Sequence, residues 1–367
     1  MWYGQIVIGP PGSGKSSYCF GMQQLLTALE RQHIIVNLDP MNDLLPYECA
    51  VDVMDLIKGT DVMKKHQLGP NGAMIYCMEF LLENVDWLVE KLKKYKNYYV
   101  LIDCPGQVEL FTHHEALRTI IRHLEKLDFR MAAVQVLDST LCTDTFKVRS
   151  HSSSSSNNNI SSSSIILASS SSRYDKCAQL ARSGSELPFT VLLFLVMLLF
   201  LLQHISALLM ALYAQLQLEL PHINVLSKID LLRHHRKDLK FPLEFYADAY
   251  DVQALLQTMG RDPHPVGQKL LGFAREVCEL VEDFNIVSFL PVAVTDKECM
   301  LLALRTADTA NGFALGNYTE NRTGYPLQLN TEEERQNLIE RLQERYLDGD
   351  EEDERDGNFR QDSEKTD

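Results

Sequence analysis

Short apolar runs, each followed by a stretch of mixed polarity, recur along the chain and predict an alternation of strands and helices. The runs expected to form strands are residues 6–8, 34–37, 99–102, 131–137, 223–226 and 286–290. Apolar residues spaced by three and four predict helices over 15–29, 74–96, 266–284, 297–311 and 332–346. Apolar strands that alternate with helices are typical of a mainly parallel sheet with helices on both faces. We therefore expect an α/β fold, a three-layer α/β/α sandwich.

The turn after the first strand carries a specific motif, GPPGSGKS, over residues 9–16. Two glycines five apart, followed by a lysine and a hydroxyl, fit the P-loop pattern, and the fold expected is that of a P-loop NTPase. Glycines let backbone N–H groups curve round a phosphate, and the next helix directs its positive end at the same anion. The residues expected to bind phosphate are Gly12, Ser13, Gly14, Lys15, Ser16 and Ser17, and Ser16 is also an expected Mg²⁺ ligand. An ordinary glycine-rich turn is the alternative.

Two aspartates stand at strand ends, where such folds place groups that contact ligands. Asp103 opens the sequence Asp-Cys-Pro-Gly-Gln, which is typical of the segment that responds to a γ-phosphate. We expect Asp103 to hold Mg²⁺, Gly106 to meet the γ-phosphate and Gln107 to lie near the attacking water. Asp39 is expected to contact Mg²⁺ or water, with a turn or helix cap as the alternative.

Two segments between these strands give weaker signals. The polar segment 43–55, which contains Tyr47, is a candidate for a region that changes with nucleotide state. Residues 69–72, Gly-Pro-Asn-Gly, taken alone predict a tight turn before a helix, because proline fixes φ and Asn-Gly favours turns.

The sequence Ser-Lys-Ile-Asp at 227–230 follows a strand and has the pattern that reads guanine. A carboxylate can accept hydrogen bonds from both N1–H and N2–H₂ of guanine, which adenine does not offer. Ser227, Lys228 and Asp230 are therefore the expected guanine-binding residues, with the stem of Lys228 lying over the base. The tetrapeptide is common alone, but its position after Asp-x-x-Gly makes GTP the expected nucleotide and hydrolysis to GDP and phosphate the expected reaction.

Composition narrows the class of protein. The chain has 367 residues and a formal net charge of −15, with many of the acids in 349–367. A general nucleic-acid binder needs a basic surface, so direct nucleic-acid binding is not expected. The eight cysteines show no metal-binding spacing, and the first residues enter a core strand instead of a signal peptide. We expect reduced thiols and a cytoplasmic protein.

The motifs GPPGSGKS, VNLDP, LGPNG, DCPGQVEL, LPHINVLSKIDLL and VSFLP, in this order, resemble those of the GPN-loop GTPases over about 1–147 and 205–312. Details such as PYECAVDV and ELPHIN resemble one paralogue of that family more than the others. The resemblance implies a homodimer, or a heterodimer with a paralogue, in which Gly69, Pro70 and Asn71 of one subunit enter the partner's site.

The same resemblance implies a catalytic set and a cellular role. Asn71 from the partner would act with Asp103 and Gln107 on the attacking water, while Lys15 and Mg²⁺ neutralise charge. The family is also associated with RNA polymerase II, in its assembly and nuclear import, which implies subunits or assembly factors of that enzyme as partners and possible shuttling to the nucleus.

Residues 148–203 do not fit the family pattern. Their first half is rich in Ser and Asn and cannot build a core, whereas 189–202 are almost entirely apolar. A membrane span needs ~20 apolar residues and would interrupt a single sheet here. A regulatory insertion is the second interpretation. We favour the third, an intron translated in frame: Val148 requires a codon that begins GT, Gln203 can be CAG, and a pyrimidine-rich tract encodes Phe and Leu.

We therefore expect a GTPase domain over 1–311, interrupted by 148–203, which should carry no function and no genuine membrane span. A linker, a short amphipathic helix and an acidic tail would follow over 312–367. Two alternative functions remain open. One is a slow switch or assembly factor in which hydrolysis only resets the conformation of a dimer. The other is an ATP-dependent small-molecule kinase, against which Asp230 argues.

Overall fold

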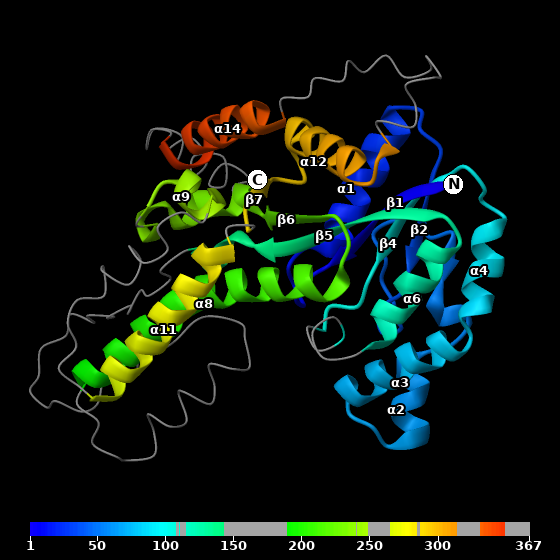
Figure 1. Ribbon diagram of the computed structural model, residues 1–367, viewed down its shortest axis with the longest axis horizontal. Coiled ribbons are helices and arrows are strands. Elements are labelled where there is room, and N and C mark those ends of the chain that lie inside the picture. Colours follow the sequence, from blue (N-terminus) through cyan, green and yellow to red (C-terminus); the bar gives the residue numbers. More distant parts are fainter. Residues whose placement is uncertain are drawn as a thin grey trace, which may run out of the picture.

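The computed structural model of the chain describes residues 1–107, 110, 115–142, 189–239, 241–248, 265–284, 287–313 and 331–348. In this part of the chain, parallel strands form one seven-stranded sheet in the order β3-β2-β4-β1-β5-β6-β7 (Figure 1). The strands are β1 (Trp2–Ile8), β2 (His33–Asn37), β3 (Val51–Asp52), β4 (Tyr99–Asp103), β5 (Phe129–Asp138), β6 (His222–Ser227) and β7 (Phe289–Val292). All their carboxyl ends meet at one edge, where ligands of such sheets bind.

Helices cover both faces of the sheet (Figure 1). One face carries α1 (Lys15–Ala28) and α12 (Lys297–Ala310). The other carries α3 (Pro70–Glu83), α4 (Val85–Lys93) and α6 (Glu115–Lys126). The remaining helices are α2 (Gly59–His66) beside α3, α8 (Phe189–Leu218) along α11 (Pro265–Phe284), α9 (Leu243–Asp248) beside β7, and α14 (Thr331–Leu342) on α12. The expected three-layer sandwich is confirmed.

The apolar runs are continuous because the central strands are buried on both faces. In β1, Ile6 and Ile8 point into one core cluster and Val7 into the other. All five residues of β4 are buried. Successive side chains of a strand point to opposite faces, so a strand covered by helices on both sides has no polar face.

Most element boundaries differ from the sequence prediction by a few residues, but two predictions were wrong. The helix expected over 74–96 is two helices, because Asn84 has φ −109° and ψ 30° and ends α3. The last strand, expected over 286–290, covers Phe289–Val292 and includes Pro291, which is tolerated because β7 is an edge strand. Several elements are not among those predicted, including β3, α2 and α6.

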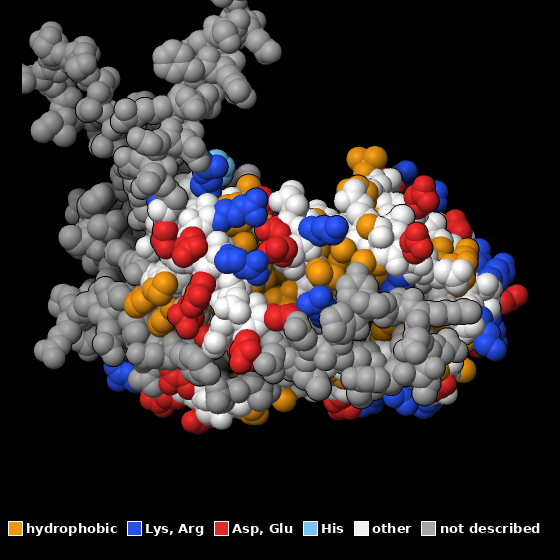
Figure 2. All heavy atoms as spheres, turned by 90° about the horizontal axis from the view of Figure 1, so that it is seen from above, with side chains coloured by type: hydrophobic (Ala, Val, Ile, Leu, Met, Phe, Trp, Pro, Cys, Tyr) orange, Lys and Arg blue, Asp and Glu red, His pale blue; other side chains and the backbone are white. Residues whose placement is uncertain are grey.

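The expected amphipathic helix near the carboxyl end is α14, and its apolar side belongs to the core. Leu338, Ile339 and Leu342 are buried in the same cluster as α1 and α12. The π-helical turn that follows, η5 (Gln343–Asp348), packs on η3 (Ile229–Asp238). Figure 2 views this face and shows basic and acidic side chains intermixed. The expected linker and acidic tail lie, for 314–330 and 349–367, outside the described residues.

The start of the segment that departs from the family pattern, 148–188, lies outside the described residues. Its apolar end forms the first half of α8, which continues without a break into Ile205 and Leu208 of the core. The flanks of the segment meet, because Sγ of Cys142 and Nδ1 of His204 are 3.7 Å apart. Among the described residues, no helix is both long and apolar enough to cross a membrane.

We predict that deletion of 148–203 preserves the fold and leaves GTP affinity within about twofold. Residues 143–147 remain to join Cys142 to His204. A shorter loop also lowers the entropic cost of closing it, by about 0.6 kcal/mol for each halving of its length. Thermal unfolding and nucleotide titration measure both effects. The matched control is deletion of 148–208, which also removes Ile205 and Leu208 and should destabilise the fold by about 2–5 kcal/mol per large side chain lost. If the variant that lacks only 148–203 folds but does not bind GTP, the segment has a function.

Candidate functional site

The P-loop occupies the turn between β1 and α1. Gly12 and Gly14 have φ of +78° and +96°, a region that side chains other than glycine rarely adopt. A Cβ on Gly9 would lie 2.2 Å from the carbonyl oxygen of Val136, so only glycine fits beside β5. Ser13 is buried, and its Oγ has no hydrogen-bond partner. The loop therefore has the shape that its sequence predicts.

Lys15 begins α1 and is 8% exposed. Its Nζ donates to the carbonyl oxygen of Pro10 at 3.1 Å. Burial lowers the pKa of Lys15, while the nearby charges of Asp103 and Asp39 raise it. An ammonium group in a buried site attracts an incoming phosphate more strongly than one in water does.

The carboxylate of Asp103 is held by two hydroxyl groups. Ser16 Oγ and Tyr47 Oη both donate to Oδ2 of Asp103, each at 2.7 Å. Oδ1 of Asp103 is buried and has no hydrogen-bond partner. Burial raises the pKa of Asp103, and the hydrogen bonds from Ser16 and Tyr47 and the charge of Lys15 oppose that shift. The structure thus brings together Ser16 and Asp103, two of the three residues predicted to contact Mg²⁺.

These residues fit the requirements of magnesium. Mg²⁺ usually takes one or two carboxylates and keeps waters or phosphate oxygens as its other ligands. The open Oδ1 of Asp103 beside the Ser16 hydroxyl offers such a partial set. In the part of the chain that the structure describes, no group of three or more His, Cys, Asp or Glu side chains could hold a metal by itself.

Asp39 makes the turn-capping hydrogen bond that the sequence offered as an alternative to a metal contact. Its Oδ1 accepts from the N–H of Met41 at 3.0 Å, and its own N–H donates to Oδ1 of Asn37 at 3.0 Å. It is still close enough to Lys15 and Asp103 to shift their pKa values. Burial raises the pKa of Asp39. Asp39 therefore shapes the turn after β2 at the rim of the site.

The segment after β4 lies against the P-loop. A Cβ on Gly106 would lie 2.9 Å from Nζ of Lys15 and 3.0 Å from Cα of Pro11. Nε2 of Gln107 donates to Oδ1 of Asn71 in the same chain at 3.1 Å, while Oε1 of Gln107 is buried without a partner. These contacts bring Gly106, Gln107 and Asn71 to the same edge of the sheet as Lys15.

Residues 69–72 form the start of a helix, so the tight turn expected from these residues alone was wrong. Gly69 caps α3 in an extended conformation, and Pro70 occupies the first turn, where its missing N–H costs nothing. Gly69, Pro70 and Asn71 are exposed, in contrast to the buried Ala73 that follows. A helix amino terminus also carries partial positive charge.

The sequence predicted to read guanine, residues 227–230, is bonded directly to the P-loop. Nζ of Lys228 donates to the carbonyl oxygen of Gly12 and to Oδ2 of Asp138, each at 2.7 Å. Lys228 has φ +61°, which turns the chain from β6 into η3, and Asp230 lies in the first turn of η3. Oγ of Ser227 donates to the carbonyl oxygen of Leu137 at 2.9 Å. Ser17 is exposed in the first turn of α1.

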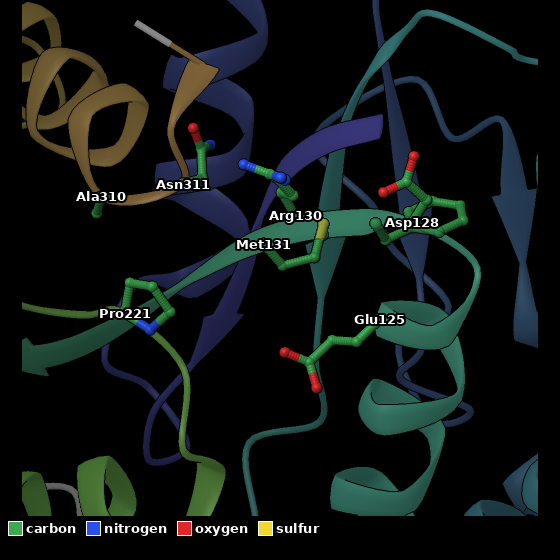
Figure 3. Close-up of a pocket in the computed structure, with 8 residues that line it drawn as sticks. Glu125, Asp128, Arg130, Met131, Pro221, Ala310 and Asn311 are labelled. Atoms are coloured by element: carbon green, nitrogen blue, oxygen red, sulfur yellow. The ribbon is translucent and has the colours of Figure 1, made fainter. Parts of the chain in front are cut away.

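Sequence reasoning gave no role to two residues of this edge. Asp138 forms an ion pair with Lys228. The sequence could have indicated this pair, because Asp138 ends β5 and Lys228 follows the neighbouring strand β6 at the same edge of the sheet. Tyr47 was named only as part of a polar segment, and no pattern marks a loop tyrosine as a partner of Asp103. A pocket of about 300 Å³ is lined by other residues, including Glu125, Arg130 and Asn311. It lies where β5 begins, at the opposite edge of the sheet (Figure 3).

Comparison with known proteins assigns this arrangement to a family. A family model described as a conserved hypothetical ATP-binding protein matches residues 7–182 and 178–313. The chain is 40% identical to GPN-loop GTPase 2 of Danio rerio over 318 residues, covering 87% of this chain and 83% of the relative. It is 36% identical to GPN-loop GTPase QQT1 of Arabidopsis thaliana over 354 residues, covering 96% and 99%. The chain belongs to the GPN-loop GTPase family.

Further comparisons agree with this assignment. GPN-loop GTPase 2 of Schizosaccharomyces pombe is 41% identical over 317 residues, covering 86% of this chain and 82% of the relative. A GTPase of Pyrococcus abyssi in its apo form has the same fold, with a TM-score of 0.55, 20% identity, and 84% and 97% of the chains covered. The resemblance inferred from the motifs is confirmed, and the chain is a GTP-hydrolysing P-loop enzyme.

We predict that Gly106→Ala lowers the rate of GTP hydrolysis at least tenfold, equivalent to about 1.4 kcal/mol in the barrier. The added methyl group would meet Nζ of Lys15 and the backbone of Pro11, so Lys15 would have to move and the P-loop and the segment after β4 would have to shift apart slightly. Single-turnover hydrolysis at saturating GTP measures the effect. Gly272→Ala in α11 is the control, since a Cβ there meets nothing within 4 Å. Equal rates for both variants would contradict the prediction.

Proposed function

We propose that this GTPase works with Mg²⁺ held by Ser16 and Asp103, and that Lys15 binds the β- and γ-phosphates. The observation that carries the proposal is that three of the ten buried side-chain atoms without partners among the described residues belong to the P-loop and the segment at the end of β4: Ser13 Oγ, Asp103 Oδ1 and Gln107 Oε1. Buried polar groups are nearly always hydrogen-bonded, so unsatisfied atoms gathered at one site support a ligand there. When bound, Mg²⁺ would neutralise charge on the phosphates.

The roles of the other residues follow from their chemistry and position. The backbone N–H groups of residues 12–17 and of Gly106 would bind phosphate oxygens, in the manner of a loop at a helix amino terminus. Gln107 would orient the attacking water through Oε1, the acceptor left open in its side chain. Asp39, which already caps a turn, would contact the hydration shell of the metal.

The same proposal extends to the base. Asp230 would accept hydrogen bonds from the guanine edge, and the Lys228 stem would cover the ring while its Nζ holds the P-loop. Ser227, whose Oγ donates to the carbonyl oxygens of Ser13 in the P-loop and Leu137 in β5, would keep this loop in register with the P-loop. A site with buried groups that match guanine discriminates strongly against a base that lacks the matching donors.

We further propose that the active form is a dimer in which Asn71 of one subunit enters the site of the other. Exposure of Gly69, Pro70 and Asn71 at a helix amino terminus supports this, together with the family resemblance. Asn71 would then stabilise the transferring phosphate where other GTPases use an arginine. Within one chain, Asn71 instead contacts Gln107, so action within the same subunit is the competing arrangement.

A mixing experiment separates the two arrangements. Asn71→Ala subunits lack the contributed side chain, and Lys15→Ala subunits lack a working phosphate site. If Asn71 acts in the partner's site, a mixed dimer has one complete site, and a 1:1 mixture should recover about a quarter of wild-type activity if the subunits exchange freely. Each variant alone stays inactive and serves as the control. No recovery, with mixed dimers confirmed by mass, would show that Asn71 acts within its own subunit.

In the cell, we propose that the protein acts in the cytoplasm, with shuttling to the nucleus, in the assembly and import of RNA polymerase II. The family resemblance supports this role, and the net charge of −15 favours protein partners over direct nucleic-acid contact. Hydrolysis could serve only to reset the dimer between clients, so turnover would be slow without a client.

We expect polymerase subunits or their assembly factors to be captured by the wild-type protein and to be lost with Lys15→Ala. Quantitative mass spectrometry of captured proteins makes the comparison, and Lys64→Ala, an exposed position in α2, is the matched surface control. Capture that is equal for Lys15→Ala and wild type would contradict a nucleotide-dependent role in assembly.

A further inference from the structure

One contact at the site has no role in the function proposed above. The hydroxyl of Tyr47 donates to Oδ2 of Asp103 at 2.7 Å, the same oxygen that accepts from Ser16. The other oxygen, Oδ1, is buried and without a partner. Two donors on one oxygen and none on the other make this carboxylate asymmetric.

The position of this hydroxyl is fixed by packing as well as by its hydrogen bond. Tyr47 is 7% exposed, and its ring belongs to the core cluster that contains Tyr18 and Cys19 of α1. Next to it, the side chain of Gln23 in α1 bonds the carbonyl oxygen of Glu48 at 3.2 Å and the N–H of Glu48 at 3.4 Å. The loop between β2 and β3 is therefore attached to α1 at Glu48, the residue next to Tyr47.

The hydroxyl can act only as a donor toward Asp103. An ionised carboxylate only accepts hydrogen bonds, so the proton in this contact comes from the phenol. A carboxylate oxygen that accepts two hydrogen bonds has little capacity left for a metal or for water bound to it. The open coordination of Asp103 is thereby confined to Oδ1.

We propose that Tyr47 is a positioning residue for magnesium binding. Its hydroxyl occupies Oδ2 of Asp103 and so leaves Oδ1 to face Mg²⁺ or water bound to it. This inference rests on the proposed role of Asp103 as a magnesium ligand. It also gives the 43–55 segment a physical link to the metal site, because the tyrosine that orients the ligand belongs to that loop.

The test measures the Mg²⁺ concentration that the site requires and does not depend on hydrolysis. Fluorescence of a bound GDP analogue is followed during Mg²⁺ titration for wild type, Tyr47→Phe, Asp103→Asn and Tyr18→Phe. We expect Tyr47→Phe to raise the half-saturating Mg²⁺ concentration about tenfold, the scale of one hydrogen bond to a charged group. Affinity for the analogue in EDTA should not change. The phenylalanine keeps the ring that fills the core.

Tyr18→Phe is the matched control. It also removes one buried hydroxyl from the same core cluster, where Tyr18 donates to Oε1 of Gln5 at 2.9 Å. It should destabilise the fold, as measured by thermal unfolding, without changing the Mg²⁺ requirement. An equal change in both tyrosine variants would show a general structural effect and would overturn the inference.

Asp103→Asn distinguishes the inference from the function on which it rests. If Asp103→Asn leaves the Mg²⁺ requirement unchanged, the proposed metal site itself is wrong. If Asp103→Asn raises the half-saturating concentration and Tyr47→Phe leaves it at the wild-type value, the metal site stands and the role of Tyr47 is overturned.

Discussion

The pairing of β1 with β4 fixes the distance between the P-loop and the carboxylate of Asp103, and the site depends on it. Val7, which precedes the P-loop by two residues, is the parallel partner of Asp103. On the other side, Asn37 at the end of β2 is also a partner of Asp103. A buried carboxylate is costly unless it is hydrogen-bonded, and here the donors are hydroxyls of Ser16 and Tyr47. Neutral donors keep the charge of Asp103 available to a cation.

The α1 helix that carries Lys15 and Ser16 is itself held by buried polar contacts. Tyr18 of α1 donates to Gln5 of β1, and Gln5 donates to the hydroxyl of Tyr99 in β4 at 3.1 Å. Beyond the end of α1, Arg31 makes a bidentate ion pair with Asp308 of α12. These contacts join α1 to two strands and to α12 independently of any ligand. Packing and polar contacts therefore organise the site before the nucleotide arrives, which is a condition for effective electrostatic catalysis.

The sequence predicted the layers and the edge of the sheet that carries the site, because apolar runs and strand-end motifs are local signals. Asp103 is the last residue of β4, Lys15 begins the helix after the turn that follows β1, and Asp230 lies shortly after β6; a parallel sheet brings such positions together. Contacts that depend on loop path were not predictable in this way. Tyr47 reaches Asp103 across 56 positions of the chain, and no periodicity encodes that approach. The break at Asn84 was missed for a similar reason, since apolar spacing continues through it.

The 148–203 segment separates two parts of the chain whose contacts with each other hold Lys228. Oγ of Ser139 donates to the carbonyl oxygen of Lys228 at 3.1 Å, and Asp138 holds Nζ of Lys228. Both residues precede the segment, while β6 and η3 follow it, and β5 pairs with β6 directly. The contacts that hold Lys228 thus come from residues outside the segment on either side. An added stretch at Cys142 changes the length of one connection, and closure entropy grows only slowly with loop length. The loop proposed to read the base is therefore held in place by contacts that do not depend on the length of that connection.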